Sequence, residues 1–315
     1  MNTKAIGIAF VAGCACVFCI ASVRTAGLAA VPFLFLASVP IYAAALSFGT
    51  IASIAASGFS ILIAAILLSA EAAVFLGLAY TIPASLIGHQ ANLAQQNQDG
   101  GLEWYPLNRL FLNLCLAVGI GVISLGFLNP FNEETLLPVA REALEEVFRQ
   151  NPSPTPISQA EVEQIAKSVL GLLPFMFASM WLIVHVINAH LAAMICRATG
   201  SLPRPKDNLP KQITLPVSAV IMMSFSLLAC LLFSGTLLVF AKIFAGIFLT
   251  AFALIGLAGI HQFARTSDGG KIILVACYIL IFLFFLPLFL LSIGGVIRSL
   301  NPNQNNPQNA GPNST

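Results

Sequence analysis

Charged side chains are scarce in this sequence. Asp, Glu, Lys and Arg make up 8% of its 315 residues, whereas hydrophobic residues make up 58% and the mean hydropathy is +0.92. A soluble domain carries about 25% charged residues to hydrate its surface. So little charge excludes an ordinary water-soluble fold. The net charge of +2, from cations scattered along the chain, also argues against nucleic acid as a partner.

The sequence also lacks the motifs of common soluble enzymes. No nucleophile elbow, Walker loop, HExxH sequence or dinucleotide-binding fingerprint occurs in a supporting context. Cys14, Cys16 and Cys19 lie close together, but in an apolar stretch with no His or carboxylate nearby. There a Cys usually serves as a small hydrophobe, and a metal or redox role is the lesser alternative. We therefore expect no enzymatic activity, no metal site and no cofactor.

What the sequence has is a series of long apolar runs. Runs of roughly 20 residues can cross about 30 Å of hydrocarbon as helices, and the absence of apolar–polar alternation argues against a membrane barrel. We predict an all-α polytopic transmembrane helix bundle of about nine spans, at residues 5–23, 26–46, 51–68, 72–87, 110–128, 169–196, 215–233, 237–258 and 272–296. Only Ser69, Ala70 and Glu71 separate the third span from the fourth, and a single kinked helix there would leave eight spans.

The distribution of Lys and Arg predicts the orientation, because cytoplasmic segments are enriched in these residues. With the N-terminus in the cytoplasm, nine spans place eight cations inside: Lys4, Arg109, Arg197, Arg204, Lys206, Lys211, Arg265 and Lys271. Five lie outside: Arg24, Arg141, Arg149, Lys167 and Arg298. We expect a multi-pass protein embedded in the lipid bilayer of a bacterial inner membrane, with a cytoplasmic N-terminus and an extracytoplasmic C-terminus.

The first span carries two further patterns. Ala5, Ala9 and Gly13 form a ridge of small residues that allows close helix approach, either within the bundle or against a partner membrane protein. The run also has the shape of a signal peptide, with Val11-Ala12-Gly13-Cys14 resembling a lipoprotein processing box. The chain stays apolar through Ile20, however, as an uncleaved span does.

A polar insertion divides the spans. Leu137, Ala140 and Leu144 recur at helical spacing with glutamates on the other side, the breaker-rich residues 151–156 follow, and Ser158-Gln-Ala-Glu161 forms a capping box. We expect a solvated extracytoplasmic helical hairpin, or alternatively a lid or docking surface. The predicted divisions are a five-span bundle at 1–129, the acidic insertion at 130–168, a four-span bundle at 169–298 and a disordered polar tail at 299–315.

Polar residues within the spans are candidates for a binding site, because burying them in lipid is costly. Trp181, His185 and Asn188 lie in the sixth span, and their spacing puts His185 and Asn188 on one face. Glu71 and Lys242 lie near the outer ends of their spans, where they could line one outward-facing hollow. These five are candidate ligand contacts. The alternatives are hydrogen bonds between helices for the first three, and snorkelling to the interface for Lys242.

Two aromatic residues precede the fifth span. Trp104 and Tyr105 could dock a protein partner, or they could belong to the aromatic belt at the membrane interface. Together with Ala5, Ala9 and Gly13 they complete the candidate docking residues.

Two short segments carry a resemblance. They are Gly101-Leu-Glu-Trp-Tyr-Pro106 with Asn108-Arg109-Leu110, and Asn188-Ala-His-Leu-Ala-Ala-Met-Ile-Cys-Arg197 leading into Gly200-Ser-Leu-Pro-Arg-Pro205. Both resemble the YybS-like family of bacterial multi-pass proteins, which carry a domain of unknown function. That family is distantly similar to the substrate-binding components of energy-coupling-factor transporters. The resemblance implies a first helix whose small residues dock a partner subunit, and an outward hollow for a vitamin or metal. The chain departs from such components in having more spans and an acidic insertion.

Two functions from different classes follow. The first is a solute-binding or transport component, in which the five candidate ligand contacts bind a small molecule. The second is a non-transporting scaffold for envelope, division or translation-linked assemblies, in which Trp104, Tyr105 and the acidic insertion contact proteins.

Overall fold

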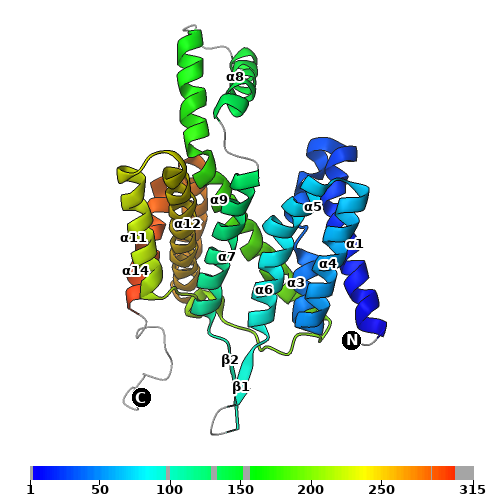
Figure 1. Ribbon diagram of the computed structural model, residues 1–315. Helices are drawn as coiled ribbons and strands as arrows, with labels where there is room; N and C mark the ends of the chain where they lie inside the picture. Colours follow the sequence, from blue (N-terminus) through cyan, green and yellow to red (C-terminus); the bar gives the residue numbers. More distant parts are fainter. Residues whose placement is uncertain (1–2, 97–99, 129–132, 152–156, 285, 302–315) are drawn as a thin grey trace.

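The computed structural model describes residues 3–96, 100–128, 133–151, 157–284 and 286–301. These residues form helices and one two-stranded hairpin (Figure 1). In chain order the elements are α1 (Thr3–Ala26), η1 (Gly27–Ala30), α2 (Val31–Phe35), α3 (Val39–Phe48), α4 (Thr50–Leu67), α5 (Ala70–Leu76), the π-helix η2 (Gly77–Thr81), α6 (Ile82–Ala91), β1 (Ala94–Gln96), β2 (Leu102–Trp104), α7 (Leu107–Leu128), α8 (Glu133–Gln150), α9 (Gln159–Ala198), α10 (Leu209–Gln212), α11 (Val217–Leu232), α12 (Gly235–Thr266), α13 (Gly270–Leu283) and α14 (Leu286–Leu300).

The predicted all-α fold of apolar helices is confirmed. Six stretches of the described residues are long and apolar enough to cross a membrane: Ala5–Phe48, Thr50–Leu67, Ala70–Ala91, Leu107–Leu128, Gln159–Ala198 and Gly235–Thr266. Three shorter helices, α11, α13 and α14, are also apolar. The count of nine passes is not confirmed.

The third and fourth predicted spans are separate helices. α4 ends at Leu67, and the Ser69 hydroxyl caps α5 by accepting a hydrogen bond from Ala72 N at 3.1 Å. The two segments then run antiparallel, since the side chains of Thr50 and His89 meet at 2.6 Å near one end. The alternative of a single kinked helix is therefore wrong.

Prolines interrupt two of the apolar segments. Pro32 and Pro40 occupy first-turn positions of α2 and α3, and Leu36–Ser38 between these helices is a turn. Pro83 likewise lies in the first turn of α6, directly after η2. Proline has no N–H, and its ring clashes with the carbonyl four residues earlier. Each interruption therefore leaves a backbone carbonyl without its α-helical donor.

The ninth predicted span, residues 272–296, is not one helix. α13 runs back along α12, because Gly270 lies against Ala264 and the Tyr278 hydroxyl lies 2.8 Å from His261 Nε2. α14 then runs in the same direction as α12. Ser292 Oγ donates to Leu249 O at 2.7 Å, and further along both helices Arg298 donates to the Gln262 side chain. The expected single span is thus an antiparallel pair of short helices.

The pairing of α13 and α14 places Arg298 on the same face as Lys211. Arg298, at the end of α14, donates hydrogen bonds to the carbonyls of Pro210 and Lys211, the latter at 2.9 Å. Lys211 was expected inside and Arg298 outside, and residues in direct contact cannot lie on opposite faces of a membrane. The expectation that Lys211 and Arg298 lie on opposite faces is therefore wrong. α1 begins and α14 ends at the same end of the bundle (Figure 1).

The acidic insertion forms the predicted helical hairpin. Ser158 and Glu161 make the expected capping box at the start of α9, which continues for 40 residues into the bundle. α8 packs against the first turns of α9, and both project beyond the other helices (Figure 1). Arg141 on α8 joins the two helices through an ion pair with Glu163 at 3.7 Å. Residues 152–156 and most of the predicted disordered tail, 302–315, lie outside the described residues.

Close backbone contact between α12 and α14 gives the first prediction. A Cβ on Gly295 would lie 1.9 Å from Phe252 O, whereas one on Gly294 would have nothing within 4 Å. We expect Gly295→Ala to lower the free energy of unfolding by about 1–3 kcal/mol, because α14 must move away from α12. The matched Gly294→Ala variant should keep or gain stability. Thermal unfolding in detergent measures both, and equal stability of the two variants would contradict this packing.

Candidate functional site

The sixth predicted span, α9, presents a buried polar face. Trp181, His185 and Asn188 are 3%, 0% and 1% exposed, and they follow one another at helical spacing. His190, two residues after Asn188, is exposed. Side chains this deeply buried need hydrogen-bond partners, so the identity of those partners shows what the face does.

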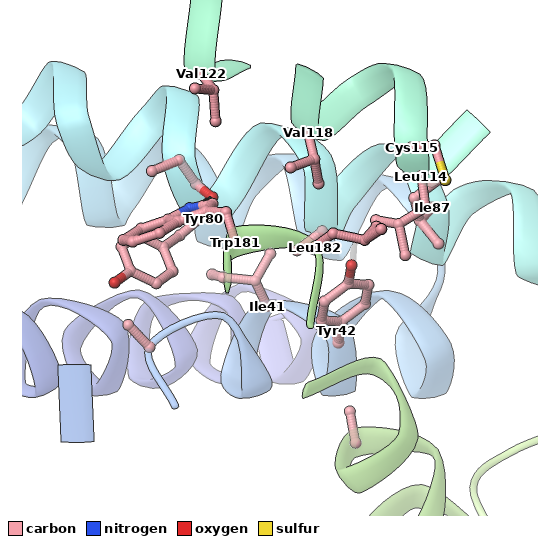
Figure 2. Packing of buried hydrophobic residues seen from close by; sticks show 14 of the residues in the cluster. Ile41, Tyr42, Tyr80, Ile87, Leu114, Cys115, Val118, Val122, Trp181 and Leu182 are labelled. Carbon is pink, nitrogen blue, oxygen red and sulfur yellow. Dashed lines mark hydrogen bonds between the residues drawn. The ribbon is translucent and has the colours of Figure 1, made fainter. Parts of the chain in front are cut away.

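Trp181 and His185 share one acceptor, the carbonyl of Ala79 in η2. The distances are 2.8 Å from Trp181 Nε1 and 2.7 Å from His185 Nε2. In an α-helix this carbonyl would accept from residue 83, which is a proline. Two side chains from α9 therefore take the place of a missing backbone donor. Figure 2 shows Trp181 packed beside Tyr80, the residue that follows Ala79.

The contact with Ala79 also determines how His185 is protonated. Because a carbonyl only accepts, Nε2 carries a proton, and Nδ1 of a neutral imidazole accepts from the Tyr42 hydroxyl 3.1 Å away. Tyr42 lies in α3, so His185 joins α3 and η2 through α9. This arrangement makes His185 a cross-link between three segments.

Asn188 forms hydrogen bonds at the other interruption, the turn at Leu36–Ser38. Its amide nitrogen donates to Phe35 O at 2.7 Å and to Ser38 Oγ at 2.6 Å. The α-helical donor for Phe35 O would be Val39 N, which bonds to Leu36 O instead. Asn188 thus compensates for the turn between α2 and α3, just as Trp181 and His185 compensate for the interruption before α6.

Lys242 makes a similar contact with α9. Its ammonium group donates to Gly171 O at 2.6 Å, one turn before Pro174, the proline inside α9. Glu71 is exposed in the first turn of α5, and no ion pair joins it to Lys242 within the described part of the chain. A hollow lined by both Glu71 and Lys242 stays a prediction, and the contact shown for Lys242 is the one with Gly171 O.

Some buried polar atoms near the two interruptions have no hydrogen-bond partner among the described residues. They are the Tyr80 hydroxyl, the Thr81 hydroxyl and the Asn188 amide oxygen. The Tyr80 ring packs against the rings of Phe75 and Trp181, with centroids 5.9 and 5.3 Å away. A buried polar atom without a partner is uncommon and often marks the place of a water or ligand.

The ridge on α1 faces the inside of the bundle. Ala9 and Gly13 are buried, and a Cβ on Gly13 would lie 2.9 Å from Ala56 O in α4. Ala5, at the start of the ridge, is half-buried. The expectation that this ridge docks a partner protein is therefore corrected for Ala9 and Gly13, whose surface α4 already covers.

The aromatic pair before α7 also has internal contacts. Tyr105 donates its backbone N–H to Leu93 O at 2.9 Å, and its hydroxyl accepts from the Asn113 amide at 3.2 Å. Trp104 is half-buried and lines a groove. Tyr105 is thus a packing residue, whereas Trp104 keeps an accessible edge.

Sequence reasoning missed the structural role of Arg204, which it counted only as a loop cation. Arg204 is 8% exposed and forms a two-point ion pair with Asp207, at 2.8 and 3.2 Å. It also donates to Tyr105 O at 3.0 Å, fixing the segment before α10 to the base of the β1–β2 hairpin. The sequence does carry a signal, an Asp three residues after an Arg that is flanked by prolines.

These contacts define the class of the protein, a membrane-embedded helical bundle whose interrupted helices are cross-linked by polar side chains. Among the described residues, no group of three or more His, Cys, Asp or Glu could hold a metal ion. No family model, curated protein or solved structure matches the chain. The resemblance to the YybS-like family therefore stays a prediction.

The contacts of Asn188 give the second prediction. Asn188→Leu should lower the free energy of unfolding by about 1–2 kcal/mol, because Phe35 O and Ser38 Oγ lose their donor in an apolar interior. His190→Leu on the exposed side of α9 is the control and should change stability little. Equal effects of the two substitutions on unfolding in detergent would show that Asn188 does not cross-link α9 to the turn.

Proposed function

We propose that this chain is a bacterial inner-membrane protein that binds or transports a small solute. One observation carries the proposal: the interruptions at Leu36–Ser38 and at Gly77–Thr81 meet the polar face of α9, and the hydroxyls of Tyr80 and Thr81 and the amide oxygen of Asn188 on α9 are buried there with no hydrogen-bond partner among the described residues. In many transporters the substrate site lies where membrane helices are discontinuous, because the interruption exposes backbone polar groups at that depth.

The chemistry of these atoms supports an uncharged solute. Two are hydroxyls, on Tyr80 and Thr81, and the third is the amide oxygen of Asn188. Hydroxyls donate and accept, whereas an amide oxygen only accepts. A small polar molecule with both donors and acceptors suits this set. Trp181 and His185 would act as positioning residues, because their donors already hold Ala79 O, next to Tyr80 in the chain.

The distribution of charge supports an N-terminus in the cytoplasm. With the start of α1 and the end of α14 on one face, the chain makes an even number of passes. Nine of the 14 cations then lie on the N-terminal face, with Arg298 added to the eight expected there. The other face holds Arg24, Arg141, Arg149 and Lys167, and Lys242 lies within a helix. This bias is the one that cytoplasmic segments show.

A scaffold function is the second candidate, and the helical arm favours it. The arm consists of α8 and the facing first turns of α9, and α8 packs chiefly against α9. Its outer side exposes Val139 and Val147 beside Glu142. A partner protein could dock there without contacting the bundle. A mass-spectrometric search for small molecules and proteins in the gently solubilised complex separates the two candidates.

Tyr80 provides the third prediction, a test of the solute site. Tyr80→Phe removes only the unpartnered hydroxyl, so it should weaken binding of the co-purifying solute about fivefold to tenfold while stability is kept. Tyr278→Phe, at the exposed partner of His261, is the control and should bind normally. Unchanged solute affinity in Tyr80→Phe, or a complex that holds a protein partner but no solute, would reject the site.

Cysteine accessibility provides the fourth prediction. In intact cells, Asn208→Cys and Asn301→Cys should resist a membrane-impermeant thiol reagent, and Glu142→Cys should react with it. After lysis all three should react. The unsubstituted protein measures the background from its own seven cysteines. Labelling of Asn301→Cys but not Asn208→Cys in intact cells would restore an odd number of passes and contradict the paired α13 and α14.

A further inference from the structure

A polar groove lies beside the start of α7, at the end of the bundle where α14 ends. It holds about 320 Å³ and is lined by Trp104, Asn108, Arg204, Asp207, Gln212 and Thr214, with Leu107 as its aliphatic member. Three segments build it: the end of β2, the first turn of α7 and the segment around α10. Neither the solute site nor the helical arm includes any of these residues.

One wall of the groove is rigid and electrically neutral. The Arg204 guanidinium is paired with Asp207 and also reaches the carbonyls of Tyr105 and Ala91, at 3.0 and 3.4 Å. These contacts use most of its N–H groups and fix its plane. Arg204 therefore fixes the shape of the groove, and other residues must neutralise the charge of any ligand.

The remaining polar groups in the groove are mainly donors. The amide oxygens of Asn108 and Gln212 already accept from backbone N–H groups at 2.8 and 2.9 Å, which leaves their NH2 groups to donate. Within the described part of the chain, no hydrogen bond is made by either NH2 group, the Trp104 indole N–H or the Thr214 hydroxyl. Such a set favours a ligand rich in acceptor atoms.

Basic residues flank the groove's lining residues in the sequence. Arg109, Lys206 and Lys211 each adjoin a lining residue in the chain, are exposed, and make no ion pair with another described residue. Glu103 is the acidic side chain beside Trp104. The excess of positive charge, together with the donors inside, favours an anion. Because the apolar α7 begins at Leu107, the groove lies level with lipid headgroups.

We propose that this groove binds the phosphate of an anionic phospholipid headgroup. Trp104, Asn108, Gln212 and Thr214 donate to the phosphate oxygens, the three cations supply the attraction, and Leu107 contacts the first carbons of the lipid. Basic pockets at the cytoplasmic ends of membrane helices take such headgroups. The proposal is independent of the solute site. Inorganic phosphate has the same chemistry and is the competing source of the ligand.

The test compares lipid binding to the full chain by native mass spectrometry. The probes are phosphatidylglycerol and phosphatidylcholine with identical acyl chains. We expect a preference for phosphatidylglycerol that Lys206→Gln with Lys211→Gln lowers at least about fivefold, because each cation near an anionic surface contributes about that factor. The matched control is Arg265→Gln with Lys271→Gln, which removes two exposed cations that adjoin no lining residue. Thr214→Val should also lower the preference, without any change in charge.

The outcomes are distinct. Phosphatidylglycerol that stays bound in excess inorganic phosphate supports the lipid, and its displacement overturns the lipid in favour of free phosphate. No preference between the two lipids would overturn the site. An equal loss in both double variants would also overturn it, because the attraction would then belong to the whole basic face.

Discussion

A backbone carbonyl that loses its helical donor inside a membrane has no water to bind, and leaving it unpaired costs several kcal/mol. This chain has prolines at the start of α2, α3 and α6, and the interruptions they make would be unstable on their own. α9 supplies the missing hydrogen-bond donors. Trp181 and His185 donate to Ala79 O, and Asn188 donates to Phe35 O, so one helix stabilises both interruptions.

The need to supply donors to these carbonyls explains where the buried polar residues of the spans lie. Most of the buried donors on α9, together with Lys242, are already bound to backbone carbonyls. Beside the same interruptions, the hydroxyls of Tyr80 and Thr81 and the amide oxygen of Asn188 have no hydrogen-bond partner among the described residues. The carbonyls at the interruptions are therefore paired by α9, while polar atoms beside them are still free to bind hydrogen-bonding groups. These free atoms point to a solute.

The sequence predicted the features that depend on local chemistry. Apolar runs gave the helices, Ser158 and Glu161 gave the start of α9, and helical spacing placed His185 and Asn188 on one face. It could not show that these side chains bind carbonyls more than 100 residues away, because packing sets that pairing. Continuous hydrophobicity also concealed the end of α13 at Leu283, although Pro287 marked the start of a new helix. Likewise, small residues on α1 predicted close approach without identifying α4 as the neighbour.

The central claim is that α9 holds the interrupted helices through specific hydrogen bonds. A double-mutant cycle for unfolding in detergent, with Asn188→Leu, Ser38→Ala and the double variant, tests it most directly, because the two side chains are 2.6 Å apart. The account predicts a coupling free energy of about 0.5–1.7 kcal/mol, within the range of hydrogen bonds between membrane helices. Additive effects, with a coupling free energy of zero, would contradict it.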